Sequence, residues 1–250
     1  MYSVTHSQAS FESGGKDIRL DCFLPDAAGR RFPAVIGLHG SRGGHVTMSE
    51  PATLLAGQGF AVYVLHYFDR TGTTEIDGLQ TIFVHFPAWM KTLWDAVSFV
   101  SWRPQVDPER IGLVGFSLGA YLSVSAAAID SRVKAVVEFF GGLPKEMKFF
   151  MRRLCPVLIL HGEQDKTVPV EEAYHLQQVL EKKKMPYEIQ IYPGAGHGFS
   201  GEVWRDAGLR TLAFLQKHLG SSSAGSPQAD QSSATLDSPE LAGGIARKIS

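Results

Sequence analysis

The feature that most constrains the fold of this chain is a series of short apolar runs that alternate with longer amphipathic segments. These runs are nearly continuous stretches of aliphatic and β-branched residues; they span 33–40, 60–67, 111–116, 133–140 and 156–162. Strands that are buried on both faces of a parallel sheet have this composition. Because helical segments separate the runs, the pattern predicts a mostly parallel sheet with helices on both faces.

Two further strands are predicted to be less buried than the others. Residues 17–24 alternate polar and apolar side chains, which indicates an antiparallel strand with one solvated face. Residues 187–194 are more polar and are expected nearer an edge of the sheet. Helical periodicity predicts the intervening helices, which are expected over 86–103, 117–129, 169–184 and 202–219.

The end of the chain differs from the rest in composition. Residues 220–250 contain no aromatic side chain and are dominated by serine, alanine and glycine. Such a segment cannot bury enough apolar surface to offset the entropy lost on ordering. The sequence therefore predicts one domain over 1–219, followed by a flexible tail over 220–250.

Charge and cysteine content exclude several classes of protein. The 24 Lys and Arg residues nearly balance the 25 Asp and Glu residues, which argues against a nucleic-acid partner. No window approaches the roughly 18 apolar residues that span a bilayer, and the first ten residues lack the character of a signal peptide. Cys22 and Cys155 have no metal-type spacing and are too few for a disulfide framework. We expect a cytoplasmic enzyme with buried, reduced thiols and no membrane partner; its oligomeric state stays open.

The stretch VGFSLGAYL, residues 114–122, carries the first candidate for catalysis. It joins a buried strand to a small-residue helix, and Gly115 and Gly119 flank Ser117 at a distance of two residues. On such a sharp turn a serine projects its hydroxyl out of the sheet, and its flanking positions must be small. Ser117 is therefore the predicted nucleophile, and the backbone N–H of Leu118 is a predicted oxyanion donor.

A serine nucleophile needs a base and an orienting acid, each expected after a later strand. Asp165 follows the strand at 156–162, and His197 lies in a glycine-rich loop after the strand at 187–194. Glu163 in the same loop and Glu138 at the end of another strand compete with Asp165. We predict Asp165 as the acid, because the loop before the 169–184 helix has room to direct it.

Nine histidines compete for the role of base. Gly196 and Gly198 flank His197 and let the loop turn its side chain toward a serine. His39 and His161 end strands before a glycine, which favours structural, hydrogen-bonded roles. The other six lie in strand or helix patterns or have no placing signal: His6, His45, His66, His85, His175 and His218.

The glycine-rich loop over 37–45 is predicted to complete the oxyanion hole. The backbone N–H of Ser41 is the candidate second donor, with that of Arg42 as the alternative. The long connection over 66–86 is expected to wall the substrate pocket, as long loops in compact domains often do. Residues predicted to line an apolar pocket, or to bind a substrate carboxylate, are Arg42, Tyr67, Phe68, Arg70, Phe140 and Phe199.

Four motifs, HGSRGG, GFSLGAY, HGEQDKTVP and GAGHGF, resemble in order and spacing those of the dienelactone hydrolase family of α/β-hydrolases. The resemblance covers residues 10–219 approximately. It implies an α/β-hydrolase fold with an eight-stranded sheet whose first strands include the region around 7–15. It also implies that Ser117, Asp165 and His197 take the positions of nucleophile, acid and base.

Two departures from the family pattern modify the expected activity. Dienelactone hydrolases proper have a cysteine nucleophile, where this chain has Ser117. They also have a glutamate directly after the histidine that follows the third strand, where Gly40 follows His39. We therefore predict a serine hydrolase of small esters or lactones that requires no metal or organic cofactor. A prolyl oligopeptidase-type peptidase, an acyltransferase and, least favoured, a non-catalytic binding protein remain as alternatives.

Overall fold

The computed structural model describes residues 1–76, 78–145, 147 and 154–220. The tail predicted over 220–250 lies outside the described residues, except for Gly220. Within the described part, no helix combines the length and the apolar character that crossing a membrane requires. Cys22 is buried as expected, whereas Cys155 is only half-buried.

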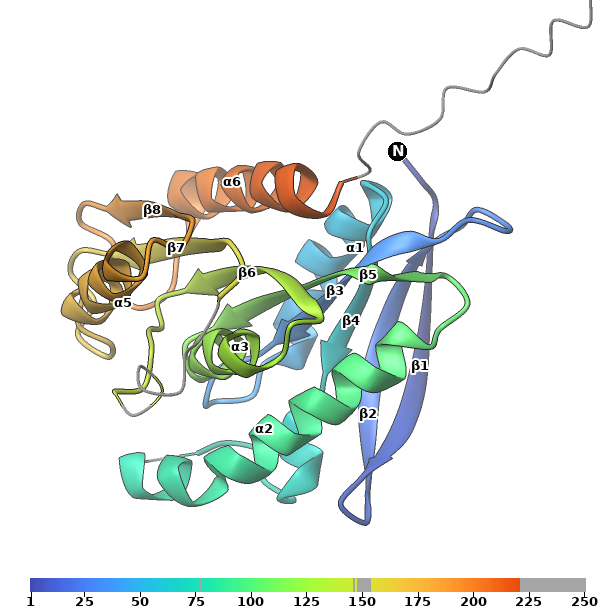
Figure 1. Cartoon of the computed structure of the whole chain (residues 1–250), viewed down its shortest axis with the longest axis horizontal. Helices are drawn as coiled ribbons and strands as arrows, with labels where there is room; N and C mark the ends of the chain where they lie inside the picture. Colours follow the sequence, from blue (N-terminus) through green and yellow to red (C-terminus); the bar gives the residue numbers. More distant parts are fainter. Residues whose placement is uncertain (77, 146, 148–153, 221–250) are drawn as a thin grey trace, which may run out of the picture. The chain divides into compact units, whose positions relative to one another are not determined.

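Eight strands form one sheet in the order β1-β2-β4-β3-β5-β6-β7-β8 (Figure 1). The pairs β1–β2 and β2–β4 are antiparallel, and every other neighbouring pair is parallel. This confirms the mostly parallel eight-stranded sheet, with the most polar parallel strand, β8, at its edge. The strands are Val4–Ser13 (β1), Lys16–Pro25 (β2), Phe32–Leu38 (β3), Ala61–Leu65 (β4), Val106–Phe116 (β5), Val133–Phe139 (β6), Val157–Gly162 (β7) and Tyr187–Tyr192 (β8).

Helices cover both faces of this sheet, as predicted (Figure 1). Buried residues of α2, α3 and α5 pack in one apolar core, and those of α1 and α6 pack in the core on the other face. The helices are Ser49–Gly57 (α1), Leu79–Ser101 (α2), Leu118–Ile129 (α3), Glu171–Lys182 (α5) and Gly201–Leu219 (α6), with 3-10 turns at His45–Met48 (η1) and Tyr67–Arg70 (η2).

The helix α2 begins seven residues before its predicted start at 86 and continues through Pro87. Proline removes the hydrogen bond to the carbonyl four residues earlier, here that of Phe83. Phe83 is 66% exposed, so water can satisfy the free carbonyl. The connection predicted as a loop over 66–86 is therefore partly helical at both ends.

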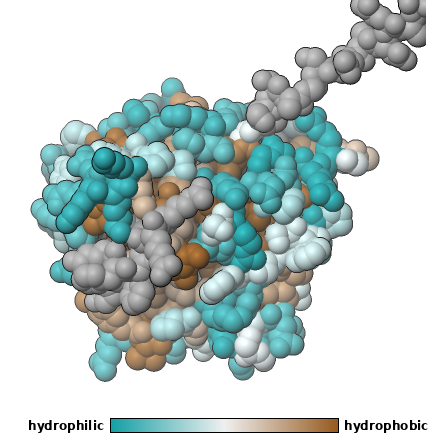
Figure 2. Space-filling view, in the orientation of Figure 1, coloured by the Kyte–Doolittle hydropathy of each residue, from teal (hydrophilic) through white to brown (hydrophobic). Residues whose placement is uncertain are grey.

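The two halves of α2 differ in what their apolar residues contact. The predicted stripe is buried against the sheet and consists of Trp89, Leu93, Val97 and Val100. In the first half, Leu79, Phe83 and Val84 are exposed instead. Figure 2 shows apolar residues low on the visible face, in the part where Figure 1 draws the beginning of α2.

Candidate active site

Ser117 stands on a tight turn between β5 and α3, with a φ of 53°. This left-handed conformation is strained for a residue other than glycine. Close packing explains the two flanking glycines: a Cβ at position 115 would lie 2.3 Å from the Gly119 carbonyl oxygen, and one at 119 would lie 2.4 Å from that of Leu38. The N–H of Ser117 donates to the carbonyl of Phe139 at 2.9 Å, which anchors the turn to β6.

His197 bridges Ser117 and Asp165 by two side-chain contacts. Its Nε2 lies 3.1 Å from Oγ of Ser117, and its Nδ1 lies 2.8 Å from Oδ2 of Asp165. The imidazole and the ring of Phe140 pack edge to face, with ring centroids 4.8 Å apart. The structure thus brings together the three residues that the sequence predicted as nucleophile, base and acid.

Backbone donors fix the carboxyl group of Asp165. Its Oδ1 accepts hydrogen bonds from the N–H groups of Thr167 at 2.8 Å and Val168 at 2.9 Å, which leaves Oδ2 directed at His197. The side chain of Asp165 is fully buried. Its loop neighbour Glu163, the alternative acid, is exposed.

Glu138, the other alternative acid, is buried at the end of β6 but lacks such support. Its Oε2 accepts the N–H of Gly141 at 2.8 Å, and its Oε1 has no hydrogen-bond partner in the described part of the chain. Burial raises the pKa of this carboxyl group to about 8, and only the Gly141 hydrogen bond opposes that shift. Glu138 is therefore largely protonated at neutral pH, unlike an acid that must stabilise an imidazolium ion.

The loop after β3 runs directly beside the nucleophile. A Cβ at position 40 would lie 3.4 Å from Cβ of Ser117, so Gly40 lies directly against the serine. His39 is buried, its Nδ1 lies 2.8 Å from the Gly40 carbonyl, and burial lowers its pKa to about 4. A neutral imidazole in this setting agrees with the structural role predicted for His39.

A crevice of about 590 Å³ opens over Ser117 and His197. Three predicted pocket residues, Arg42, Phe140 and Phe199, line it, together with Ser41. Leu118 follows Ser117 as the first residue of α3 and is buried. The oxyanion roles of the Ser41 and Leu118 backbone N–H groups remain predictions.

Three residues predicted for the pocket lie elsewhere, which corrects the expectation that the 66–86 connection walls the pocket. Tyr67 is fully buried: its hydroxyl donates to the His39 carbonyl at 2.8 Å and its ring stacks on the His39 imidazole. Phe68 packs in the core against His39 and Trp89. Arg70 donates hydrogen bonds to the carbonyls of Ser13 and Gly14 in the β1–β2 turn. Tyr67 and Phe68 therefore pack against His39 beneath the site, and Arg70 lies outside it.

Several wall residues were not anticipated from the sequence. They are Met48 and Pro51 before and within α1, Phe116 directly before the nucleophile, Thr167 beside the acid, and Ser200 and Trp204 after the histidine loop. Phe116 and Trp204 could have been found by their positions, because each lies close in sequence to a predicted triad residue. Met48 and Pro51 belong to η1 and α1, two elements for which the sequence has no clear helical pattern.

Comparison with known proteins gives three related findings. The sequence profile of the dienelactone hydrolase family matches residues 20–208. A protein of Yersinia pestis named "Putative carboxymethylenebutenolidase" is 26% identical over 87% of this chain and 90% of that protein. Acyl-coenzyme A thioesterase 5 of Mus musculus is 31% identical over 60% of this chain, which corresponds to 33% of that longer protein.

The fold is also found among solved structures. A dienelactone hydrolase-like promiscuous phosphotriesterase from metagenomic libraries superposes with a TM-score of 0.74 at 18% identity, over 87% of this chain and 99% of that one. At this identity the likeness is one of fold, and it supports the α/β-hydrolase architecture predicted from the four motifs.

Proposed function

This chain belongs to the dienelactone hydrolase family and is a carboxylic ester hydrolase; from that premise we propose that it cleaves small esters or lactones through an acyl-enzyme on Ser117. The observation that carries the proposal is the contact chain from Ser117 Oγ through His197 to Asp165, with distances of 3.1 and 2.8 Å. Both lengths suit the transfer of a proton from the hydroxyl to the imidazole.

Formation of the acyl-enzyme uses each of the three residues. Oγ of Ser117 attacks the carbonyl carbon while its proton passes to Nε2 of His197. Asp165 accepts the Nδ1–H hydrogen bond, which keeps the imidazole in the required tautomer and stabilises the imidazolium ion. The negative charge on the carbonyl oxygen is held by the N–H groups of Leu118 and Ser41, and loss of one such donor costs about 3 kcal/mol of transition-state stabilisation.

Collapse of the first tetrahedral intermediate releases the alcohol or, in a lactone, opens the ring. His197 donates its proton to the leaving oxygen and then accepts a proton from water, which attacks the acyl carbon. A second tetrahedral intermediate releases the acid and restores Ser117. No step in this sequence requires a metal or organic cofactor.

Glycine at position 40 fits serine chemistry in particular. Position 40 abuts the nucleophile, where the family pattern has a glutamate that manages the protonation of a thiol. A serine hydroxyl is activated by His197 and needs no such partner. The absence of a side chain at this position also leaves room beside Ser117 for the substrate.

Hydrolysis of p-nitrophenyl acetate and of a small lactone by the wild type and by Ser117→Ala tests the proposal. The variant is expected to lose about 10⁶-fold in kcat, the usual cost of removing the nucleophile of such a triad. Ser131→Ala is the matched control, because Ser131 is an exposed serine that does not line the crevice. Unchanged hydrolysis in Ser117→Ala would refute the mechanism.

A further inference from the structure

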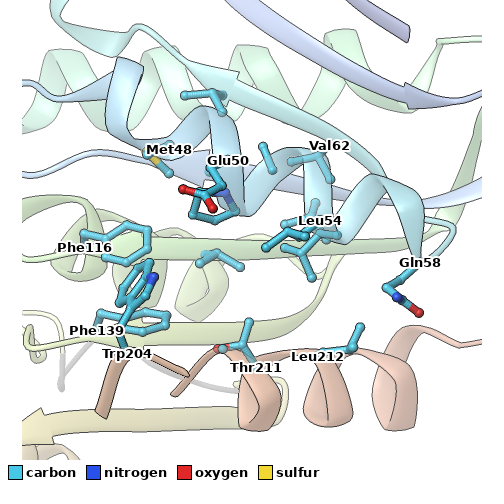
Figure 3. A pocket seen from close by; sticks show the side chains of 18 of the residues that line it. Met48, Glu50, Leu54, Gln58, Val62, Phe116, Phe139, Trp204, Thr211 and Leu212 are labelled. Atoms are coloured by element: carbon cyan, nitrogen blue, oxygen red, sulfur yellow. The ribbon is translucent and has the colours of Figure 1, made fainter. Parts of the chain in front are cut away.

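A second cavity, of about 420 Å³, lies between α1 and α6 (Figure 3). Its floor is the face of the sheet formed by β3, β4 and β5, where Val35, Val62 and Val114 line it. In Figure 3, Phe116, Phe139 and Trp204 gather at one end of the cavity and Gln58 lies at the other. Residues of α1 and α6, such as Leu54 and Leu212, face one another across it.

This cavity adjoins the catalytic crevice, because the two share part of their walls. Met48, Pro51, Phe116 and Trp204 line both spaces. The Trp204 ring lies 6.1 Å from that of Phe116, the residue directly before the nucleophile. These shared side chains therefore form the boundary between the catalytic crevice and the cavity.

The cavity's lining is suited to an alkyl chain. Among the described residues that line it, only Glu50 and Arg205 are charged, and both are exposed. Burying a charged or unpaired polar group in such a space is costly, whereas each buried methylene stabilises the complex. The cavity's uncharged polar residues are Gln58 and Thr211, whereas the crevice contains more polar groups, among them Ser41, Thr167 and Ser200.

We propose that the cavity between α1 and α6 is an acyl-chain site, and that the preferred substrates are esters of unbranched fatty acids longer than acetate. The proposal rests on the function proposed for Ser117. The leaving oxygen must lie at Nε2 of His197, which places the alcohol part in the polar half of the crevice near Thr167 and Ser200. The acyl chain is then directed past Phe116 and Met48, away from the histidine.

A series of p-nitrophenyl esters from acetate to decanoate tests this assignment. Since a buried methylene contributes about 0.8 kcal/mol, kcat/KM is expected to rise about fourfold with each added methylene until the cavity is filled. A second series keeps the acetyl group and lengthens the alcohol. That series is expected to show no comparable rise, because the alcohol part does not enter the cavity.

Gly208 offers a way to fill the cavity without disturbing the triad. It lines the cavity but not the crevice, and a Cβ added there meets no atom within 4 Å. Gly208→Phe is expected to retain acetate hydrolysis and to lose at least tenfold in kcat/KM for octanoate, the equivalent of two or more methylenes. Gly208→Ala is the matched control: it makes the same helix-favouring change but leaves the space open, so the rise with chain length should persist.

The outcomes separate the two proposals. Two results would overturn the acyl-chain site alone, provided that acetate hydrolysis depends on Ser117. In one, kcat/KM does not rise with longer acyl chains; in the other, it rises but Gly208→Phe leaves the rise intact. A gain in the alcohol series instead of the acyl series would also overturn it. If no ester is hydrolysed in a Ser117-dependent way, the proposed function fails, and the acyl-chain site fails with it.

Discussion

The carboxyl ends of β6 and β7 each present a buried carboxyl group, but the two groups have opposite surroundings. After β7, Asp165 receives two backbone N–H groups on one oxygen and His197 on the other. At the end of β6, Glu138 receives a single N–H, from Gly141, and burial raises its pKa to about 8. Both residues were candidates for the catalytic acid on sequence grounds.

The difference shows that hydrogen-bond donors, more than position along the sheet, determine what a buried carboxyl group can do. A carboxyl group that stabilises an imidazolium ion must stay ionised although it is buried away from bulk water. Hydrogen bonds from backbone N–H groups favour the ionised form of such a buried group. The loop after β7 provides them because it turns back over Asp165 at Thr167 and Val168. At Glu138 the chain provides one donor, so the neutral form is favoured.

The largest expected effect comes from exchanging each acid for its isosteric amide. Asp165→Asn removes the charge and favours the wrong tautomer of His197, so kcat should fall about 10⁴-fold. Glu138→Gln keeps an oxygen for the Gly141 N–H and should leave kcat within about twofold, like a substitution outside the machinery. Steady-state assays on p-nitrophenyl acetate measure both. A larger loss in Glu138→Gln than in Asp165→Asn would reverse the comparison.

The second effect concerns the loop after β8, which positions His197 beside Asp165. A Cβ at Gly162, the end of β7, would lie 2.5 Å from the carbonyl oxygens of Ala195 and Gly196. Gly162→Ala must therefore displace the backbone next to His197, and a shift of about 1 Å can lower kcat about 100-fold. Gly196→Ala is a control in the same loop, since its nearest atom would be 3.9 Å away. Equal kcat values for the two variants would show that this backbone packing does not position the base.

The third effect is on the pH dependence of the free energy of unfolding, and it concerns Glu138 alone. Burial raises its pKa from 4.5 to about 8, so the protonated form stabilises the fold. This contribution is fully present below pH 4.5 and is lost as the pH rises through about 8. Relative to Glu138→Gln, the wild type should lose about 5 kcal/mol of unfolding free energy across that window, because linkage between a pKa of 4.5 and one of about 8 costs roughly 1.4 kcal/mol per pH unit. Urea unfolding at both ends of the window measures the difference. Parallel pH profiles for the two proteins would contradict the assignment of a neutral Glu138.

The smallest effect is expected at His161, the other imidazole near Asp165. Its Nε2 lies 3.5 Å from Oδ2 of Asp165, but it is closer, at 2.9 Å, to the Val168 carbonyl. Burial lowers the pKa of His161, which favours the neutral form. In His161→Gln, Asp165 keeps both backbone donors, so kcat should fall less than about threefold, the size of one weak contact. A loss near that of Asp165→Asn would show that His161, not the backbone, supports the acid.

Much of the site could be predicted because its residues are tied to strand ends. Ser117 and Asp165 each follow an apolar run that indicates a buried strand, and His197 follows the more polar strand predicted at 187–194. Parallel strands bring their carboxyl ends to one edge of the sheet. The glycines around Ser117 and His197 are visible in the sequence as well. Local pattern and topology together were therefore sufficient to bring these three residues together.

The walls of the site could not be predicted in the same way. Tyr67 and Phe68 follow a strand too, but the 3-10 turn η2 directs them into the core, a packing choice that no local pattern encodes. The helix α1 was missed because its short sequence has little amphipathic periodicity. The cavity between α1 and α6 depends on the spacing of two helices far apart in the chain, which only tertiary packing determines.

The most direct test of the central claim is to label the protein with a fluorophosphonate and to locate the modified residue by mass spectrometry. The account predicts one label, on Ser117, because among the hydroxyl groups that the structure describes it is the one with a histidine base at 3.1 Å supported by a buried acid. Asp165→Asn should slow the labelling strongly, and Glu138→Gln should not. Absence of labelling in the folded wild type, or labelling at another residue, would contradict the account.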